Sequence, residues 1–447
     1  MTAEAPSPPR LRRALGPASL WGLGVGYVIS GEYFGWNLGL PLGGTYGMLA
    51  ATLLVTVMYV TFILSYAELA TAIPRAGGAY VYARRAFGPF WGFIAGLVQI
   101  IEFTFAPPAI AMAIAAYVSQ RFPLDPVLIA ILAYVVFTAI NVWGIRQAAT
   151  FELVVTVLAV TELLVFVGIT APHFQWTAFS ADPLPHGVSG IFACLPFAIW
   201  FYLAIEGVAN AAEETREPQR DVAIGFGSAM GTLVVLALAV FFCAVGVAGW
   251  HAVVYAPDAT TPSDAPLPLA LASVVGETSW LYTMLLGVGL LGLVASFHGI
   301  IMVAARAWME LGRSGVGPEA LSRVHPRTKT PVVALLVNGL VGIIAILSGK
   351  TGQIITLACF GAVSLYVISM LALLVLRSKE PDLERPFRAI AYPYFPVIAL
   401  SLAVFCLVAL TWYNPDIAAV FGVIVVVSAA AFALRGARAA PDEQAQP

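Results

Sequence analysis

The chain has 447 residues, of which 60% are hydrophobic and only 10% are charged, whereas about 25% of the residues of a soluble globular domain are charged. This composition excludes a soluble enzyme, and a formal net charge of -2 without a block of Lys and Arg argues against a nucleic-acid partner. The four cysteines stand in apolar runs without a CxxC pair, so we expect neither a disulfide framework nor a metal site, and no cofactor.

Long apolar runs follow one another along the whole chain, and a helix needs about 20 such residues to cross a bilayer. Twelve runs reach that length, at about 18–41, 45–73, 90–119, 124–144, 150–172, 189–212, 223–250, 279–305, 331–349, 353–376, 390–412 and 415–434. The sequence therefore predicts an all-α membrane protein with twelve transmembrane helices.

The basic residues between these runs predict the orientation, because positively charged loops stay on the cytoplasmic side. If the amino terminus lies inside, all but two of the 22 Lys and Arg fall in inside segments, and only Arg121 and Lys350 lie outside. We therefore expect a multi-pass protein of the plasma (inner) membrane with both termini cytoplasmic. Residues 1–17 and 435–447 are expected to be cytoplasmic tails.

Two of the predicted spans are interrupted by small or polar residues. The first contains six glycines, with Ser30-Gly31 near its middle, and the sixth contains Pro196 and Glu206-Gly207. Irregular backbone is tolerated at membrane depth only where it lines a cavity, and transporters built from inverted repeats bind their substrates at such broken helices. Close packing of helices on glycine is the alternative explanation for the first cluster.

The chain resembles the amino acid-polyamine-organocation (APC) transporter superfamily. The matching segments are AELATAIPRAGGAYVYARRAFGP at 67–89, AEETREPQR at 212–220, and residues 306–318 with His325-Pro326 and Thr330-Pro331. Within that superfamily, SGEYFGW at 30–36, EFTFAPP at 102–108 and ASFHG at 295–299 look most like the ethanolamine permeases.

The resemblance implies an inverted five-helix repeat (the LeuT-like, or APC, fold) with helices 1 and 6 broken. The ten-helix transport core would occupy 18–376, and helices 11 and 12 would lie in 377–434. It also implies secondary active import of ethanolamine or a related small amine by alternating access, usually coupled to protons or exchange. For a cationic substrate the membrane potential alone supplies about 2.3 kcal/mol per 100 mV, so potential-driven import is an alternative. The lysine that several proton-coupled relatives carry in span five is replaced here by Ala159.

The first break departs from the Gly-Ser-Gly of amino acid carriers, because the triplet here is Ser30-Gly31-Glu32. We expect Glu32 at the opening of the second half-helix, where the helix dipole stabilises an anion and where the acid would repel a substrate carboxylate. The substrate would then carry an amine and lack an acid. The alternative is a permease for zwitterionic amino acids, in which Glu32 is protonated and Ser30 and Gly31 hold the carboxylate.

Four acids, Glu32, Glu102, Glu162 and Glu206, stand inside apolar spans that contain no Lys or Arg. An ionised side chain at the bilayer centre costs roughly 3 kcal/mol, so these acids must be protonated, solvated in a cavity or paired with a visiting cation. Glu206 could instead have a purely structural role that holds span six in place. Glu162 could be neutral and hydrogen-bonded in a helix interface. Glu68 and Glu152 lie near cytoplasmic ends, where solvated structural roles are expected.

The only histidine within a predicted span is His298, for which substrate contact, proton relay and a bond to a neighbouring helix all stay open. The expected substrate-binding residues are Ser30, Gly31, Glu32, Tyr33, Glu102, Phe201, Tyr202, Ala204, Glu206 and His298. The candidates for proton coupling are Glu32, Glu102, Glu162 and His298. Enzyme motifs such as HExxH and GxSxG are absent from the sequence, which disfavours a membrane enzyme.

Overall fold

The computed structural model describes residues 15–75, 77–144, 149–313, 315 and 317–434. Most of the expected tails 1–17 and 435–447 therefore lies outside the described residues, as does Arg146, one of the arginines used to predict the orientation.

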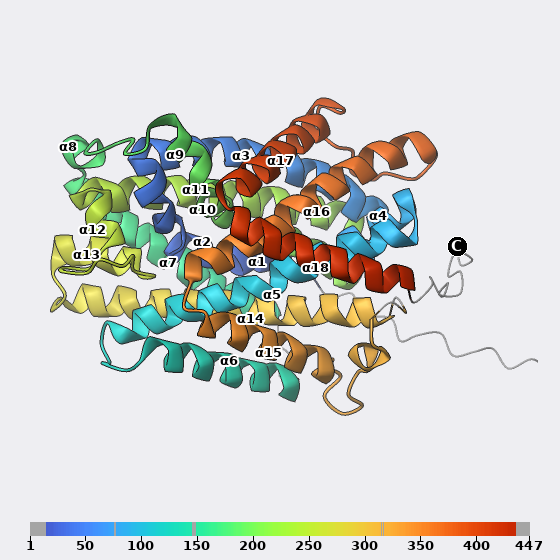
Figure 1. The fold of residues 1–447 in the computed structure, drawn as a ribbon, viewed down its shortest axis with the longest axis horizontal. Helices are drawn as coiled ribbons and strands as arrows, with labels where there is room; N and C mark the ends of the chain where they lie inside the picture. Colours follow the sequence, from blue (N-terminus) through green and yellow to red (C-terminus); the bar gives the residue numbers. More distant parts are fainter. Residues whose placement is uncertain (1–14, 76, 145–148, 314, 316, 435–447) are drawn as a thin grey trace, which may run out of the picture.

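Long helices run side by side along one axis of the molecule (Figure 1). The long ones are α3 (Leu40–Ala72), α5 (Pro89–Ser119), α6 (Pro126–Trp143), α7 (Ala149–Thr170), α11 (Pro218–Ala248), α14 (Trp280–Arg313), α15 (Val332–Leu347), α16 (Thr351–Lys379), α17 (Tyr394–Tyr413) and α18 (Pro415–Leu434). Of these, α3 has a kink at Gly44 (φ 63°), where the backbone leaves the helical region. Together with the two interrupted spans described below, they confirm the prediction of an all-α, twelve-span membrane protein.

Shorter helices lie in the connections. They are α4 (Ala79–Phe87), η2 (Ala171–His173), α8 (Trp176–Phe179), α9 (Gly187–Ala193), α12 (Trp250–Val254), α13 (Pro266–Val275) and η4 (Glu319–Ser322). The last span, α18, packs on α5, α16 and α17, and Phe432 is its one buried residue. Its remaining apolar surface is what a helix facing lipid requires.

The first span is interrupted later than the sequence suggested. The backbone stays in the right-handed helical region through α1 (Pro17–Val28), Ile29 and α2 (Ser30–Tyr33). It then becomes extended at Phe34 (φ -162°) and turns at Gly35 (φ 90°) before η1 (Trp36–Gly39). The expectation that Glu32 opens the second half-helix is therefore wrong, because Glu32 lies in the last turn of the first half.

The sixth span is broken between α10 (Leu195–Trp200) and η3 (Ile205–Glu214). Ala204 adopts a left-handed conformation (φ 78°) directly before η3, a conformation that is uncommon outside glycine. Pro196 does not make this break. It stands in the first turn of α10, where proline is tolerated because the first amides of a helix have no partner within it.

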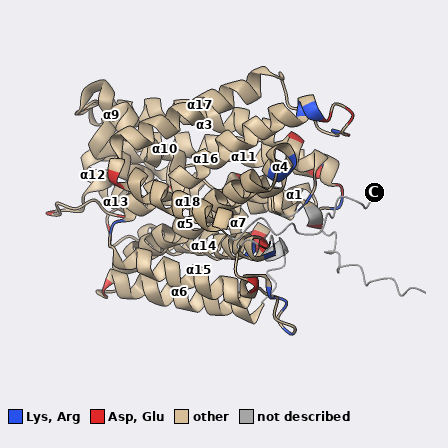
Figure 2. Ribbon diagram, turned by 45° about the vertical axis from the view of Figure 1, so that its right-hand side comes forward, with Lys and Arg blue, Asp and Glu red and all other residues tan. Residues whose placement is uncertain are grey.

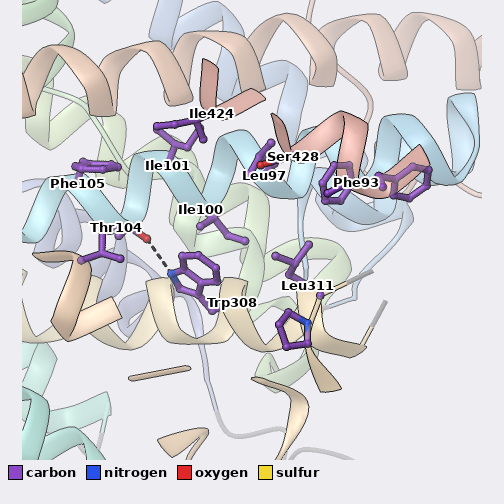
Figure 3. Close-up of a pocket in the computed structure, with 15 residues that line it drawn as sticks. Phe93, Leu97, Ile100, Ile101, Thr104, Phe105, Trp308, Leu311, Ile424 and Ser428 are labelled. Carbon is purple, nitrogen blue, oxygen red and sulfur yellow. Dashed lines mark hydrogen bonds between the residues drawn. The ribbon is translucent and has the colours of Figure 1, made fainter. Parts of the chain in front are cut away.

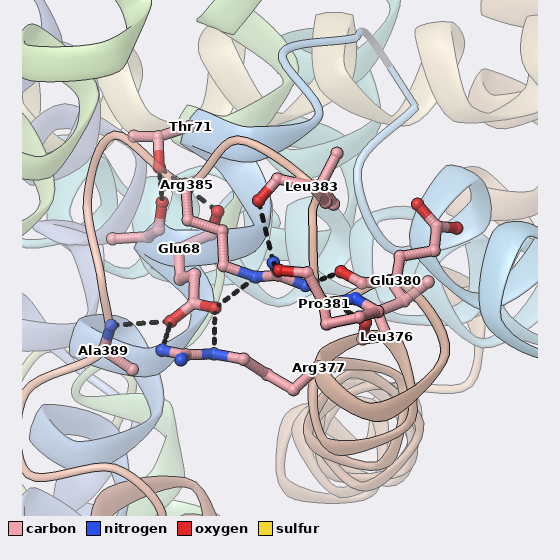
Figure 4. Close-up of polar contacts among 10 residues, drawn as sticks. Glu68, Thr71, Leu376, Arg377, Glu380, Pro381, Leu383, Arg385 and Ala389 are labelled. Atoms are coloured by element: carbon pink, nitrogen blue, oxygen red, sulfur yellow. Dashed lines mark hydrogen bonds and ion pairs between the residues drawn. The ribbon is translucent and has the colours of Figure 1, made fainter.

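Basic residues gather at one end of the helical bundle, near α4 (Figure 2). At this end Glu68, on α3, is 1% exposed and accepts hydrogen bonds from Arg377 at 2.6 and 2.7 Å. Arg385 lies 3.1 Å from the same carboxylate, and the Ala389 amide donates to it at 2.7 Å (Figure 4). Glu68 thus has a structural role, but it is buried and paired rather than solvated.

Candidate functional site

The two broken spans touch each other through their backbones. A Cβ atom added to Gly31 would lie 2.5 Å from the Trp200 carbonyl oxygen and 3.2 Å from the Phe201 Cα. Only glycine allows this approach, because any side chain would collide with the chain of the sixth span. The glycine that marked the first span in the sequence therefore joins the two breaks.

Ser30 is held by a residue that the sequence did not single out as a contact. The Ser296 hydroxyl, on α14, bonds the Tyr27 carbonyl at 2.7 Å and lies 2.9 Å from the Ser30 hydroxyl oxygen. Both serines are buried. Because these bonds join α1 to α14, the Ser30 hydroxyl is already engaged with protein.

Glu32 is completely buried, and neither of its carboxyl oxygens has a hydrogen-bond partner within the described chain. It lies close to Tyr202, which belongs to the second break. The carbonyl end of the first half-helix carries partial negative charge, which favours a cation and disfavours an anion. The Glu32 carboxyl group and the carbonyl end of the half-helix therefore both favour binding of a positively charged group at this position.

Tyr33 faces another of the predicted acids. Its hydroxyl donates to Glu162 Oε2 at 2.6 Å and lies 3.2 Å from the Ala159 carbonyl. Its ring also packs edge to face on Tyr117. Glu162 thus lies in a helix interface between the first span and α7, with its carboxyl group engaged by a hydroxyl donor.

Glu102 and Glu206 lie beside each other at the start of η3, next to the Ala204 amide. Both are buried, and three of their four carboxyl oxygens have no hydrogen-bond partner among the described residues. The fourth accepts from the Tyr366 hydroxyl at 3.1 Å. Two carboxylates in contact repel each other, so such a pair holds a proton or attracts a cation.

The predicted aromatic residues also meet at the breaks. Phe201 stacks on Trp36 with ring centroids 5.9 Å apart, and the Tyr202 hydroxyl lies 2.8 Å from Thr56 Oγ1. Aromatic faces next to an unpaired carboxyl group suit an organic ammonium ion, which gains about 0.5 to 2 kcal/mol from such rings.

His298 is not brought to the breaks. Its Nδ1 atom lies 3.1 Å from Asn141 Nδ2, on α6, and its ring packs on Phe137 of the same helix. Ser296, two residues earlier, faces the first span instead. Residues two apart point to nearly opposite sides of a helix, so His298 faces α6.

Sequence reasoning missed Asn37, which occupies the first break together with the loop after α12. Its Oδ1 accepts from the Gly35 amide at 3.1 Å, and its Nδ2 donates to the Ser263 carbonyl at 2.8 Å. The neighbouring Asp264 accepts from Thr351 at 2.8 Å, and burial raises the pKa of Asp264 to about 6. A lone amide residue inside a glycine-rich span was the signal that could have revealed this contact.

A crevice of about 350 Å³ lies away from the breaks, between α5, α14, α15 and α18 (Figure 3). It is lined mainly by apolar side chains, including Phe93, Leu97 and Ile424. Three polar side chains also line it: Trp308 donates to Thr104 at 3.0 Å, and the third is Ser428. The crevice has no charged lining residue and therefore offers no counter-charge to an ammonium or carboxylate group.

The comparisons with known proteins agree with this architecture. Residues 15–434 match a family model described as amino acid permease. An uncharacterized transporter of Rhizobium meliloti (strain 1021) is 32% identical over 91% of this chain and 88% of its own length. A branched-chain amino acid permease of Bacillus subtilis (strain 168) is 26% identical over 90% and 89%. A methylthioribose transporter of the same strain is 25% identical over 89% and 87%.

Ten of the described helices are long and apolar enough to cross a membrane. With two adjoining breaks, and matched by transporters over nearly their full length, the chain is a multi-pass membrane transporter of small molecules. The chain belongs to the amino acid permease family of the APC superfamily.

Proposed function

We propose that the protein imports a small organic amine, ethanolamine or a close relative, which binds where the first and sixth spans are broken. One observation carries the proposal: buried acids without a basic partner among the described residues lie at both breaks, Glu32 at the first, with no hydrogen bond to its carboxyl oxygens, and the adjoining Glu102 and Glu206 at the second. The ion pairs of the described chain involve other acids. A protonated amine would supply the missing positive charge.

The state of the backbone amides argues against a carboxylate in the substrate. A substrate carboxylate would be held by free amides at the start of a half-helix. At the first break the Gly35 amide is taken by Asn37, and at the second the start of η3 faces Glu102 and Glu206. An incoming carboxylate would find the Gly35 amide already bonded at the first break and would meet like charge at the second.

Transport of zwitterionic amino acids is the second candidate, and the branched-chain amino acid permease among the relatives favours it. In that case Glu32 is protonated, and Ser30 and Gly31 hold the substrate carboxylate. The Ser30 hydroxyl would have to leave Ser296, from which it lies 2.9 Å. Gly31 would have to separate from the Trp200 carbonyl. This candidate thus needs a larger rearrangement of the first break.

The proposal includes an orientation and an energy source. Basic residues at one end of the bundle (Figure 2) support cytoplasmic termini in the plasma membrane, by the positive-inside rule. A cationic substrate would gain about 2.3 kcal/mol per 100 mV of membrane potential, and proton coupling through Glu32, Glu102, Glu162 or His298 would add to it. The binding residues proposed are Ser30, Gly31, Glu32, Tyr33, Glu102, Phe201, Tyr202, Ala204 and Glu206, together with His298, which faces α6.

Uptake by purified protein in proteoliposomes tests the substrate. Radiolabelled ethanolamine should accumulate inside vesicles with a negative interior, and unlabelled ethanolamine should compete better than alanine, leucine or choline. Choline tests whether the site needs N-H donors, and the two amino acids test whether it accepts a carboxylate. If alanine or leucine competes better than ethanolamine, the amino acid assignment replaces this one.

A further inference from the structure

The apolar crevice of about 350 Å³ is not used by the proposed transport function (Figure 3). Helix α18 packs on α5, and α14 and α15 also pack on α5, so the crevice is the space left between α18 and these two helices. Helices α5, α14 and α18 are long and apolar enough to cross a membrane. In a bilayer the crevice therefore opens on hydrocarbon rather than on water.

The crevice is as long as one leaflet is thick. Its lining on α5 recurs at helical spacing at Phe93, Leu97, Ile101 and Thr104, and it extends to Phe105. The stretch from Phe93 to Phe105 spans about 18 Å at 1.5 Å per residue. One leaflet contributes about 15 Å, which is half of the hydrocarbon thickness of a bilayer. A chain that lies along this stretch would thus cross a single leaflet.

The crevice is too narrow for another helix. A volume of about 350 Å³ spread over about 18 Å gives a mean cross-section of about 20 Å². A helix with its side chains is about 10–12 Å in diameter and occupies about 80–110 Å². An unbranched hydrocarbon chain is much thinner than a helix. The shape therefore fits one such chain and excludes a span of a second copy or of another protein.

The lining also suits hydrocarbon. Trp308 donates to Thr104 at 3.0 Å, so these two polar groups satisfy each other and leave only the Ser428 side chain among the polar lining residues. Lining atoms that face a void lose van der Waals contacts that a close-fitting apolar group restores. A hydrocarbon chain would supply these contacts without burying a polar group.

One end of the crevice reaches the basic end of the bundle (Figure 2). Phe93 lies near the start of α5, and Leu311 and Phe432 lie near the ends of α14 and α18. The Phe93 and Phe432 rings stack there with their centroids 4.9 Å apart. The crevice thus runs inward from the level at which these spans end, which is the level of lipid headgroups.

Arg84 provides an available positive charge at this end. It lies beside the start of α5, because a Cβ atom added to Gly92 would lie 2.6 Å from the Arg84 Cβ. Its Nη1 donates to the Tyr80 hydroxyl at 2.8 Å, and the ion pairs of the described chain involve other arginines. A guanidinium group with free donors suits a phosphate group.

We propose that a phospholipid of the leaflet next to the basic end inserts one acyl chain into this crevice and places its phosphate near Arg84. The chain fills the space between α18 and α14 and braces α5. Glu102 stands on another face of α5, between the lining residues Ile101 and Thr104, so the lipid supports the helix that carries a proposed site residue. Lipid binding at this surface does not depend on which substrate the protein carries.

The test titrates the purified full-length protein in detergent micelles with phosphatidylglycerol whose acyl chains carry bromine, which quenches tryptophan fluorescence on contact. The chain has ten tryptophans, so the quenching of Trp308 is the difference between the wild type and Trp308→Phe. This difference should saturate at a low mole fraction of lipid and be reversed by unbrominated phosphatidylglycerol. Quenching of the remaining tryptophans should instead grow in proportion to the lipid.

Two matched substitutions on α18 locate the lipid. Ala431→Phe fills the crevice, whereas Ala430→Phe places the same ring on an exposed position outside the lining. Ala431→Phe should reduce the quenching of Trp308 at least about threefold because the ring occupies the space of the chain, and Ala430→Phe should match the wild type. The rise in melting temperature that phosphatidylglycerol gives the delipidated wild type should be lost in Ala431→Phe only. If Ala431→Phe does not fold, Val341→Phe fills the crevice from α15.

Quenching of Trp308 that does not saturate, or that the filling substitution leaves unchanged, would overturn the proposal. Absence of quenching, as expected if a protein partner covers the crevice, would overturn it as well. Arg84→Gln should raise the lipid fraction at half-saturation about fivefold, because one basic residue near the surface is lost. The exposed Arg323 provides the control as Arg323→Gln, and equal half-saturation in the two variants would contradict the placement of the phosphate.

Discussion

Replacing Glu32 by glutamine separates amine binding from folding. The substitution keeps the size of the side chain and removes a carboxyl group that makes no hydrogen bond to the described residues. A hydrogen bond between charged groups contributes about 1.5 to 3 kcal/mol, so its loss should weaken ethanolamine binding about 10- to 150-fold. Because no protein contact is broken, the melting temperature should change by only a few degrees.

The measurement is equilibrium binding of labelled ethanolamine to the purified protein in detergent, together with its thermal unfolding. Glu380→Gln is the control, because Glu380 pairs with Arg85 at the surface, away from the breaks. Binding by the wild type should also weaken at low pH if the acids must be ionised. An affinity of Glu32→Gln within twofold of the wild type would remove Glu32 from the site, and stronger binding on acidification would point to a bound proton instead.

Three further substitutions test other parts of the structure. Gly31→Ala would force a Cβ atom against the Trp200 carbonyl; it should cost about 1–3 kcal/mol of stability and abolish uptake, and an unchanged melting temperature would contradict the contact. Glu68→Gln should destabilise by about 3–5 kcal/mol, because it leaves the buried Arg385 side chain without its carboxylate; a melting curve that superimposes on the wild type would refute this. The pKa of Asp264 is raised from 3.8 to about 6, so its contribution to stability is fully present below the lower value and is lost as the pH rises through the higher one. The wild type should therefore lose melting temperature relative to Asp264→Asn over this range, and parallel profiles would contradict the raised pKa.

The spans could be predicted from the sequence because hydropathy is a property of each segment alone. A helix that crosses lipid must satisfy its own backbone and present apolar side chains, and both requirements can be recognised without knowing its neighbours. The number of spans and the two interrupted ones were recognisable for the same reason. The family resemblance was recognisable because its motifs are continuous stretches of the chain. The glycines of the first span were recognisable too, although their sequence did not distinguish a break from close packing.

The partners of the acids could not be predicted in this way, because they depend on how one helix is rotated and shifted against another. Glu162 meets Tyr33 and Glu68 meets two arginines, whereas Glu152 meets only glycine surfaces with its carboxyl group. In the sequence all three are acids within or near apolar runs. Only the packing distinguishes a paired acid from an unpaired one.

The sequence by itself determined that this chain crosses the membrane many times, and that acids outnumber bases within its spans. Only the tertiary structure decided where the first span breaks, since Gly31 must meet Trp200 while the chain turns at Gly35. That shift places Glu32 at the negative end of a half-helix rather than at the positive end. The physical reason is that hydropathy is summed along one helix, whereas the position of a break and the environment of a charge depend on contacts between helices.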